Sequence, residues 1–149
     1  MERLQLALLG LVIGAAAIWA VRNERLRRAS LAAYWQRGCA GRAWRDAFPD
    51  ASKEDIRQFL YLVVDAFGFG RERALQLAPT DSPLSLYHAA YPDPSVPDAL
   101  EIETLCRSIS KTYGAATLEA VAPGISFGEL FARTVVLRSN ISLQADRER

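Results

Sequence analysis

The sequence predicts an all-α protein in which a single N-terminal transmembrane helix precedes a small helical bundle. Three observations lead to this fold class: an uncharged apolar run near the N-terminus, later segments with apolar residues at helical spacing, and no repeat or strand-rich stretch. The 149 residues suffice for a membrane segment and one compact domain, but not for two full domains. We divide the chain into a transmembrane helix (1–21), a basic juxtamembrane helix and linker (22–51), a helical domain (52–138) and a flexible tail (139–149).

The apolar run Leu4–Val21 contains no charged residue and one polar residue, Gln5. As a helix it would be about 27 Å long, which is close to the hydrocarbon thickness of a bilayer. Trp19, near its end, is a residue type that favours the membrane interface. The competing interpretation is a cleaved signal peptide with its cleavage site at the alanines 15–17. We favour the anchor because the run is long for a signal peptide and little positive charge precedes it.

A basic segment follows the apolar run. Residues 22–48 carry seven arginines and two acidic residues, whereas residues 49–149 have an acidic excess of four. The positive-inside rule therefore predicts a single-pass protein of the inner (plasma) membrane with a cytoplasmic C-terminal domain. We expect residues 22–37 to be helical, either lying on anionic headgroups or forming a stalk that packs on the domain. The residues expected at the membrane surface are Arg22, Arg25, Arg27, Arg28 and Trp35.

Other motifs are few. No nucleic-acid-binding motif accompanies the arginines, so we predict no nucleic-acid partner. Gly10 and Gly14 form a GxxxG pair, which makes a homodimer through this helix a further expectation, although the spacing is common in segments rich in glycine and alanine. Cys39 and Cys106 show no metal-ligand spacing, and His88, the single histidine, has no nucleophile motif beside it. We therefore predict no enzyme, no metal and no cofactor.

The first helix of the domain has a clear start and end. Ser52 is a good N-cap, and Asp55 three residues later completes a pattern like a capping box. Apolar residues then recur at helical spacing through residues 56–67. Gly68 and Gly70 follow and are expected to end the helix.

The rest of the domain is predicted as one long connection and two further helices. The connection Arg71–Pro97 contains five prolines, and its leucines and tyrosines indicate a loop that is packed against a core. A helix is expected over 98–113, with acidic residues in its first turns that suit the helix dipole. A last helix is expected over 126–137, with Ser126 as N-cap and Glu129 three residues later.

This order of elements resembles the acyl carrier protein family, over roughly Ser52 to Val136. In that family the second helix opens with Asp-Ser-Leu, and here the corresponding helix opens with Asp98-Ala99-Leu100. The stretch TYGAATLEAVAPGISFGELF is similar to the family's passage into the last helix. The family's serine carries phosphopantetheine, and Ala99 has no hydroxyl. The resemblance thus implies a carrier-like fold without its cofactor, as in bacterial carrier-like proteins with an altered motif.

The same resemblance implies a docking surface. In the family, acidic residues along the second helix meet basic patches on partner enzymes. Asp98, Glu101 and Glu103 would then bind a protein partner with a basic patch. The simpler interpretation is that these acids only stabilise the start of their helix. Our leading hypothesis is a non-catalytic, membrane-anchored, acyl-carrier-like adaptor that docks a protein partner at the cytoplasmic face.

Two alternatives remain open at this point. The chain could be a genuine phosphopantetheine carrier of lipid or polyketide metabolism that is modified at another serine, either Ser82 or Ser95. Ser82 lies in Asp81-Ser82-Pro83-Leu84, which mimics the attachment motif, but the prolines leave little room for a long helix after it. The third hypothesis is a small structural subunit of a membrane complex, in which the transmembrane helix itself makes the important contacts.

Overall fold

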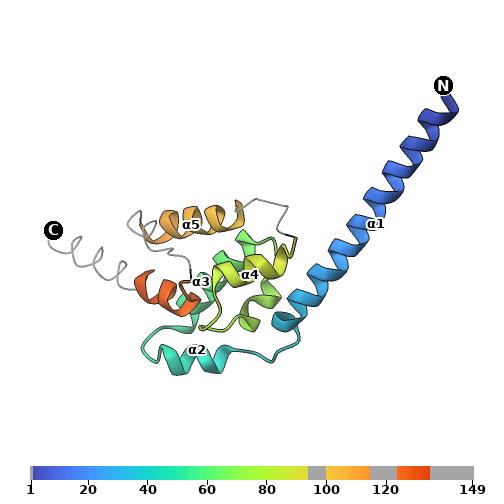
Figure 1. Cartoon of the computed structure of the whole chain (residues 1–149). Helices are drawn as coiled ribbons and strands as arrows, with labels where there is room; N and C mark the ends of the chain where they lie inside the picture. The colour runs from blue at the N-terminus through green and yellow to red at the C-terminus, as the bar shows by residue number, and fades with distance from the viewer. Residues whose placement is uncertain (1, 94–99, 115–123, 135–149) are drawn as a thin grey trace.

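The computed structural model describes residues 2–93, 100–114 and 124–134. These residues form seven helices and no strand, which confirms the all-α class (Figure 1). The elements in chain order are α1 (Glu2–Trp35), α2 (Gly41–Ala47), α3 (Lys53–Ala66), the 3-10 helix η1 (Arg71–Gln76), α4 (Pro83–Ala90), α5 (Leu100–Tyr113) and a helix at 127–134.

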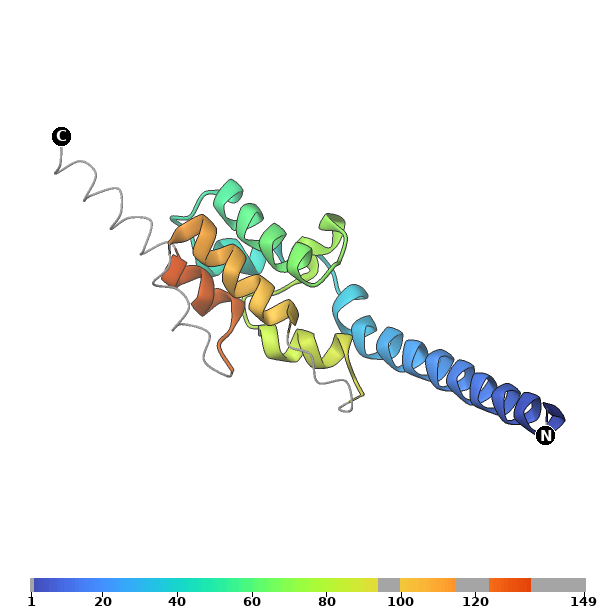
Figure 2. The same cartoon turned by 90° about the horizontal axis from the view of Figure 1, so that it is seen from above.

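Helix α1 projects away from the other helices, which gather around the inner end of this helix (Figures 1 and 2). It is a single helix of 34 residues, or about 51 Å. In the part of α1 outside the bundle the large apolar side chains are exposed, for example Leu11 at 70% and Ile18 at 72%. By length and composition the stretch Ala7–Trp35 could cross a membrane. An exposed apolar helix at the N-terminus suits a membrane anchor or a signal sequence.

The last turns of α1 belong to the domain. Leu31 and Tyr34 are buried in its core. Trp35 packs edge-on against Phe69, with 5.0 Å between the ring centroids, and the Arg73 guanidinium lies over the Trp35 ring, 5.0 Å from its centroid. This packing is what the interpretation of residues 22–37 as a stalk against the domain predicts. Trp35 is half-buried against the domain, and its place at the membrane surface stays a prediction.

An aromatic cluster forms the centre of the core. Trp44 from α2, Phe59 from α3 and Phe131 from the helix at 127–134 are almost completely buried, and the Phe131 ring lies 5.7 Å from Trp44 and 5.4 Å from Phe59. The indole Nε1 of Trp44 donates a 2.8 Å hydrogen bond to the carbonyl of Leu77. This bond satisfies both buried polar groups and ties α2 to the chain that follows η1.

Two helix starts agree with the sequence. The Ser52 hydroxyl accepts a hydrogen bond from the Asp55 amide at 3.0 Å, which confirms it as the N-cap of α3. Ser126 accepts from the Glu129 amide at 3.1 Å, and the Glu129 carboxylate accepts from the Ser126 amide at 2.9 Å, a complete capping box. The predicted continuation of this last helix to residue 137, and the tail 139–149, lie outside the described residues.

The predicted loop over Arg71–Pro97 is wrong in part, because this connection contains η1 and α4. Pro83 is compatible with α4 because it occupies the first turn, where an amide has no partner within the helix. Ser82 is the N-cap of α4, and its hydroxyl accepts from the Ser85 amide at 3.1 Å. Pro83 therefore indicates a loop by composition but lies in the first turn of a short helix.

Candidate functional site

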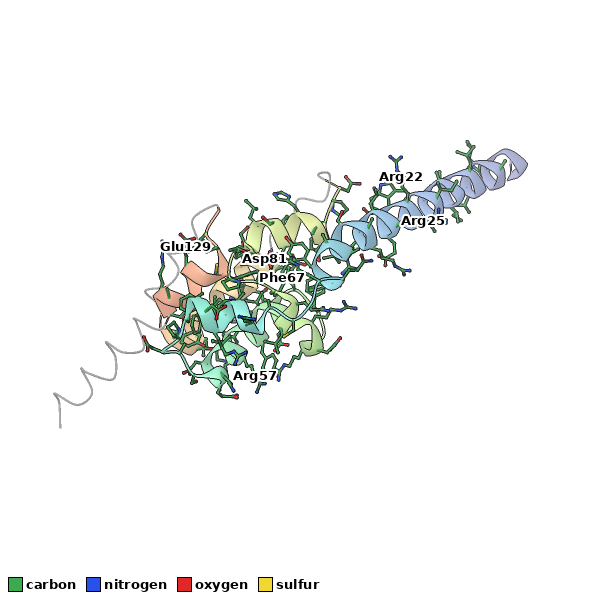
Figure 3. All side chains as sticks on the ribbon, turned by 90° about the horizontal axis from the view of Figure 1, so that it is seen from below. Arg22, Arg25, Arg57, Phe67, Asp81 and Glu129 are labelled. Atoms are coloured by element: carbon green, nitrogen blue, oxygen red, sulfur yellow. The ribbon has the colours of Figure 1, made fainter. Side chains whose placement is uncertain are left out.

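An ion pair fixes the domain to the end of α1. One guanidinium nitrogen of Arg37, Nη1, lies 3.0 Å from each carboxylate oxygen of Asp81. The same carboxylate accepts a 2.7 Å hydrogen bond from the amide of Ala78. Asp81 is only 13% exposed and Arg37 33% exposed, so water screens this pair less than a surface pair. Figure 3 shows Asp81 inside the domain, near the inner end of α1.

The arginines before this junction are mostly free of the domain. Arg22, Arg25 and Arg28 are exposed, and Figure 3 shows Arg22 and Arg25 on the part of α1 outside the bundle. Arg28 donates a 2.7 Å bond to Glu24, and this hydrogen bond lowers the pKa of that carboxyl. Arg27 is half-buried and lies 3.7 Å from the same carboxylate. The exposed positive charges directly follow the apolar part of α1, where anionic headgroups would lie.

The chain after α4 returns to this basic part of α1. Pro92 and Asp93 line a cavity of about 320 Å³ together with Trp19, Arg22, Asn23 and Leu26. One edge of the domain therefore lies beside the residues that end the apolar stretch. In a bilayer this edge would lie at the headgroup level.

The predicted acidic docking residues have different surroundings. Glu101 is half-buried and accepts a hydrogen bond from the hydroxyl of Tyr91. This hydrogen bond, with burial, raises the pKa of Tyr91 to about 12. Glu103 is exposed on α5. Asp98 and Ala99 lie outside the described residues. Glu101 thus ties α5 to the end of α4, and Glu103 is the exposed acid of the predicted set within the described part of the chain.

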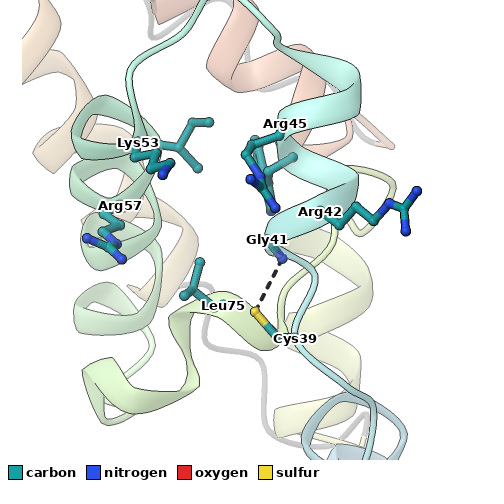
Figure 4. Close-up of a pocket in the computed structure, with 9 residues that line it drawn as sticks. Cys39, Gly41, Arg42, Arg45, Lys53, Arg57 and Leu75 are labelled. Carbon is teal, nitrogen blue, oxygen red and sulfur yellow. Dashed lines mark hydrogen bonds between the residues drawn. The ribbon is translucent and has the colours of Figure 1, made fainter.

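A basic cavity between α2 and α3 was not anticipated from the sequence. It has a volume of about 270 Å³, and its rim includes Arg45 from α2 and Lys53 and Arg57 from α3 (Figure 4). The spacings Arg42–Arg45 and Lys53–Arg57 put each pair on one helix face. These spacings are the signal that the sequence contains, but only the arrangement of α2 beside α3 brings Arg45 to the same hollow as Lys53 and Arg57.

The other candidate groups stand apart from one another. His88 is exposed on α4, with its ring 5.8 Å from that of Tyr87. Cys39 is exposed and its sulfur accepts a 3.4 Å hydrogen bond from the Gly41 amide. Cys106 is half-buried, and burial raises the pKa of its thiol. Within residues 2–93, 100–114 and 124–134, no three His, Cys, Asp or Glu side chains are grouped so that they could hold a metal ion.

The glycine pair in the apolar part of α1 is open to its surroundings. A Cβ atom placed on Gly10 or on Gly14 would meet no atom within 4 Å. A second helix could therefore approach this face closely. The homodimer stays a prediction, because the structure contains one chain.

Comparison with known proteins adds no assignment. Neither protein-family models, nor curated proteins, nor solved structures give a match to this chain. The resemblance to acyl carrier proteins therefore stays a prediction.

Proposed function

We propose that this protein is a non-catalytic adaptor, anchored in the inner membrane by α1, whose domain docks a protein partner at the cytoplasmic face. The observation that carries the proposal is the continuity of α1. Ile18 is exposed in the apolar half, while Leu31 and Tyr34 are buried in the domain core. One end of this helix requires lipid around it, and the other end is part of the domain.

Two features support an uncleaved anchor with an inward-facing domain. The alanines 15–17 lie in the middle of α1, whereas proteolysis favours exposed, irregular segments. Arg22, Arg25 and Arg28 are exposed on the domain side of the apolar stretch, which favours retention of that side in the cytoplasm.

The rigid junction supports an adaptor function. Arg37 and Asp81 hold the domain on the end of α1, and Pro92 and Asp93 lie beside its basic part. A domain fixed in this way presents the same face to every partner at the membrane. Confinement near the membrane also raises the effective concentration of the domain for partners at the same surface.

For the docking surface we keep the carrier-like hypothesis. The domain would be an acyl-carrier-like bundle in which Ala99 replaces the attachment serine, and α5 would be the recognition helix. Glu103 is exposed and available to a basic patch, whereas Glu101 is engaged by Tyr91. Glu103 is therefore the residue with which to test docking.

The test is photo-crosslinking in native membranes, with a photoreactive residue at position 103. Position 72, exposed on η1, is the matched control, because Glu72 is also an exposed acid. We expect a discrete adduct from position 103 and none from position 72. Charge reversal in a variant with Asp98→Lys should weaken that adduct. No adduct at either position, or the same adduct at both, would remove α5 as the docking surface.

One observation favours a second candidate, the carrier modified at another serine. Ser82 follows Asp81 and opens a helix, α4, which is the type of position that the attachment serine has in carrier proteins. Its hydroxyl, however, is engaged with Ser85 as the cap of that helix. Intact-mass measurement after co-expression with a phosphopantetheinyl transferase decides between the two. A mass gain of one phosphopantetheine that is lost in Ser82→Ala would replace our proposal.

A further inference from the structure

An open cavity with an apolar floor lies between α2 and α3. Trp44 and Ile56 are buried at its floor, with the half-buried Leu75 beside them, and the volume is about 270 Å³. Figure 1 shows α2 on the far side of the domain from the exposed end of α1. The cavity is therefore on a part of the domain that the membrane segment does not approach.

Three cations at the rim have no acidic partner within the part of the chain that the structure describes. Figure 4 shows Arg45 and Lys53 pointing into the gap between the two helices, with Arg57 one turn further along α3. Arg42 points away from the gap and lies 3.8 Å from Asp46. None of the nine lining residues is acidic, and among the described residues no carboxylate pairs with the three cations of the rim. Unpaired like charges around a hollow focus a positive potential into it.

The stability of α3 does not explain this arrangement. Lys53 is the first residue of α3, where the helix dipole disfavours a cation. Arg57 follows four residues later, so the two positive charges also repel each other along the helix. Glu54 lies three residues before Arg57 and can offset part of this repulsion, but no residue of α3 precedes Lys53 to do the same. A bound anion would turn both unfavourable terms into favourable ones.

We propose that this cavity binds the phosphate group of a small, soluble phosphorylated compound. Guanidinium and ammonium groups are the side chains that proteins use to bind phosphate, and the apolar floor would contact a small organic group attached to it. The cavity lies beyond the inner end of α1, and the helix from Val21 to Trp35 alone spans about 21 Å. The ligand would therefore enter from the aqueous side and would not be a headgroup of the membrane that holds α1.

The experiment uses the full chain in nanodiscs of neutral phosphatidylcholine. Inorganic phosphate and pyrophosphate are titrated at constant ionic strength, and heat is measured by calorimetry. We expect saturable binding, tighter for pyrophosphate. Lys53→Gln and Arg57→Gln should each weaken it by about tenfold or more, as expected for loss of a hydrogen bond to a charged group. Arg45→Gln tests the contribution of α2 separately.

Lys111→Gln is the matched control, because Lys111 is an exposed cation on α5, on the other side of α3 from α2 (Figure 1). This variant should bind phosphate and pyrophosphate with the same affinity as the unchanged protein. Equal weakening by this control would show a general charge effect and overturn the proposal. Failure of the protein to bind phosphate and pyrophosphate would also overturn the proposal. So would a protein whose only phosphate contact is with vesicles that contain phosphatidylglycerol. The three test positions are exposed, and circular dichroism verifies that each variant is folded.

Discussion

Arg37, just after the end of α1, pairs with Asp81 of the domain, with one arginine nitrogen 3.0 Å from both carboxylate oxygens. The two residues are 44 positions apart in the chain. Asp81 also accepts from the Ala78 amide, and its own carbonyl accepts from the Phe127 amide at 2.7 Å. One aspartate thus connects α1, the turn before α4 and the start of the last described helix.

Arg37→Ala should destabilise the domain by about 1–2 kcal/mol, because it leaves a largely buried carboxylate without its cation. The loss of stability is smaller than for a fully buried pair, because Arg37 is 33% exposed. Urea unfolding of the full chain in detergent, followed by circular dichroism, measures the change. Arg28→Ala removes the same residue type from an exposed pair on α1 and should leave the midpoint almost unchanged. Equal effects of the two substitutions would contradict this role for Asp81.

Trp44→Phe should cost about 2 kcal/mol, since it leaves the buried Leu77 carbonyl without its donor and removes part of a buried ring. The same unfolding measurement applies. Trp35→Phe is the control, because that half-buried indole donates no hydrogen bond within the described residues and a phenyl ring keeps the contact with Phe69. A larger loss of stability in Trp35→Phe than in Trp44→Phe would contradict the place of Trp44 at the centre of the core.

Stability should fall at alkaline pH through Tyr91. The hydrogen bond to Glu101 raises the pKa of Tyr91 to about 12 from its ordinary value of 10.0. The folded state therefore favours the protonated phenol, and this contribution is complete below pH 10 and is lost as pH rises toward 12. The stability difference between the unchanged protein and Tyr91→Phe should shrink over that range.

Tyr61→Phe is the control for loss of a tyrosine hydroxyl without this bond. The Tyr61 ring lies under the Arg71 guanidinium at 5.0 Å, and its hydroxyl donates to no carboxylate in the described part of the chain. At pH 8, Tyr61→Phe should therefore cost less stability than Tyr91→Phe. A difference for Tyr91→Phe that stayed constant from pH 8 to 11 would mean that the bond to Glu101 does not form in solution.

The sequence predicted features that depend on near neighbours. The caps at Ser52 and Ser126 each use a partner three residues away, and the exposed apolar helix follows from an uncharged run of residues. Composition misled at α4, since Pro83 is typical of a loop but also suits the first turn of a helix.

The features that the sequence did not predict depend on distant contacts. Nothing local indicates that Asp81 would meet Arg37, or that α2 would bring Arg45 beside Lys53. Glu101 is a further example. The sequence shows an acid near the start of a helix, which is typical of a docking residue, but it does not show that Tyr91 donates a hydrogen bond to this acid. Side-chain pairing across elements is set by packing, which periodicity does not specify.

We propose that α1 stays in the membrane with the domain on the cytoplasmic side. Cys39 tests it directly, since this exposed thiol lies between the anchor and α2. In a Cys106→Ala background, a membrane-impermeant maleimide should label Cys39 in inside-out vesicles and not in intact spheroplasts, on a chain of full-length mass. Labelling of Cys39 in intact spheroplasts, or a mature chain that begins near Ile18, would contradict the account.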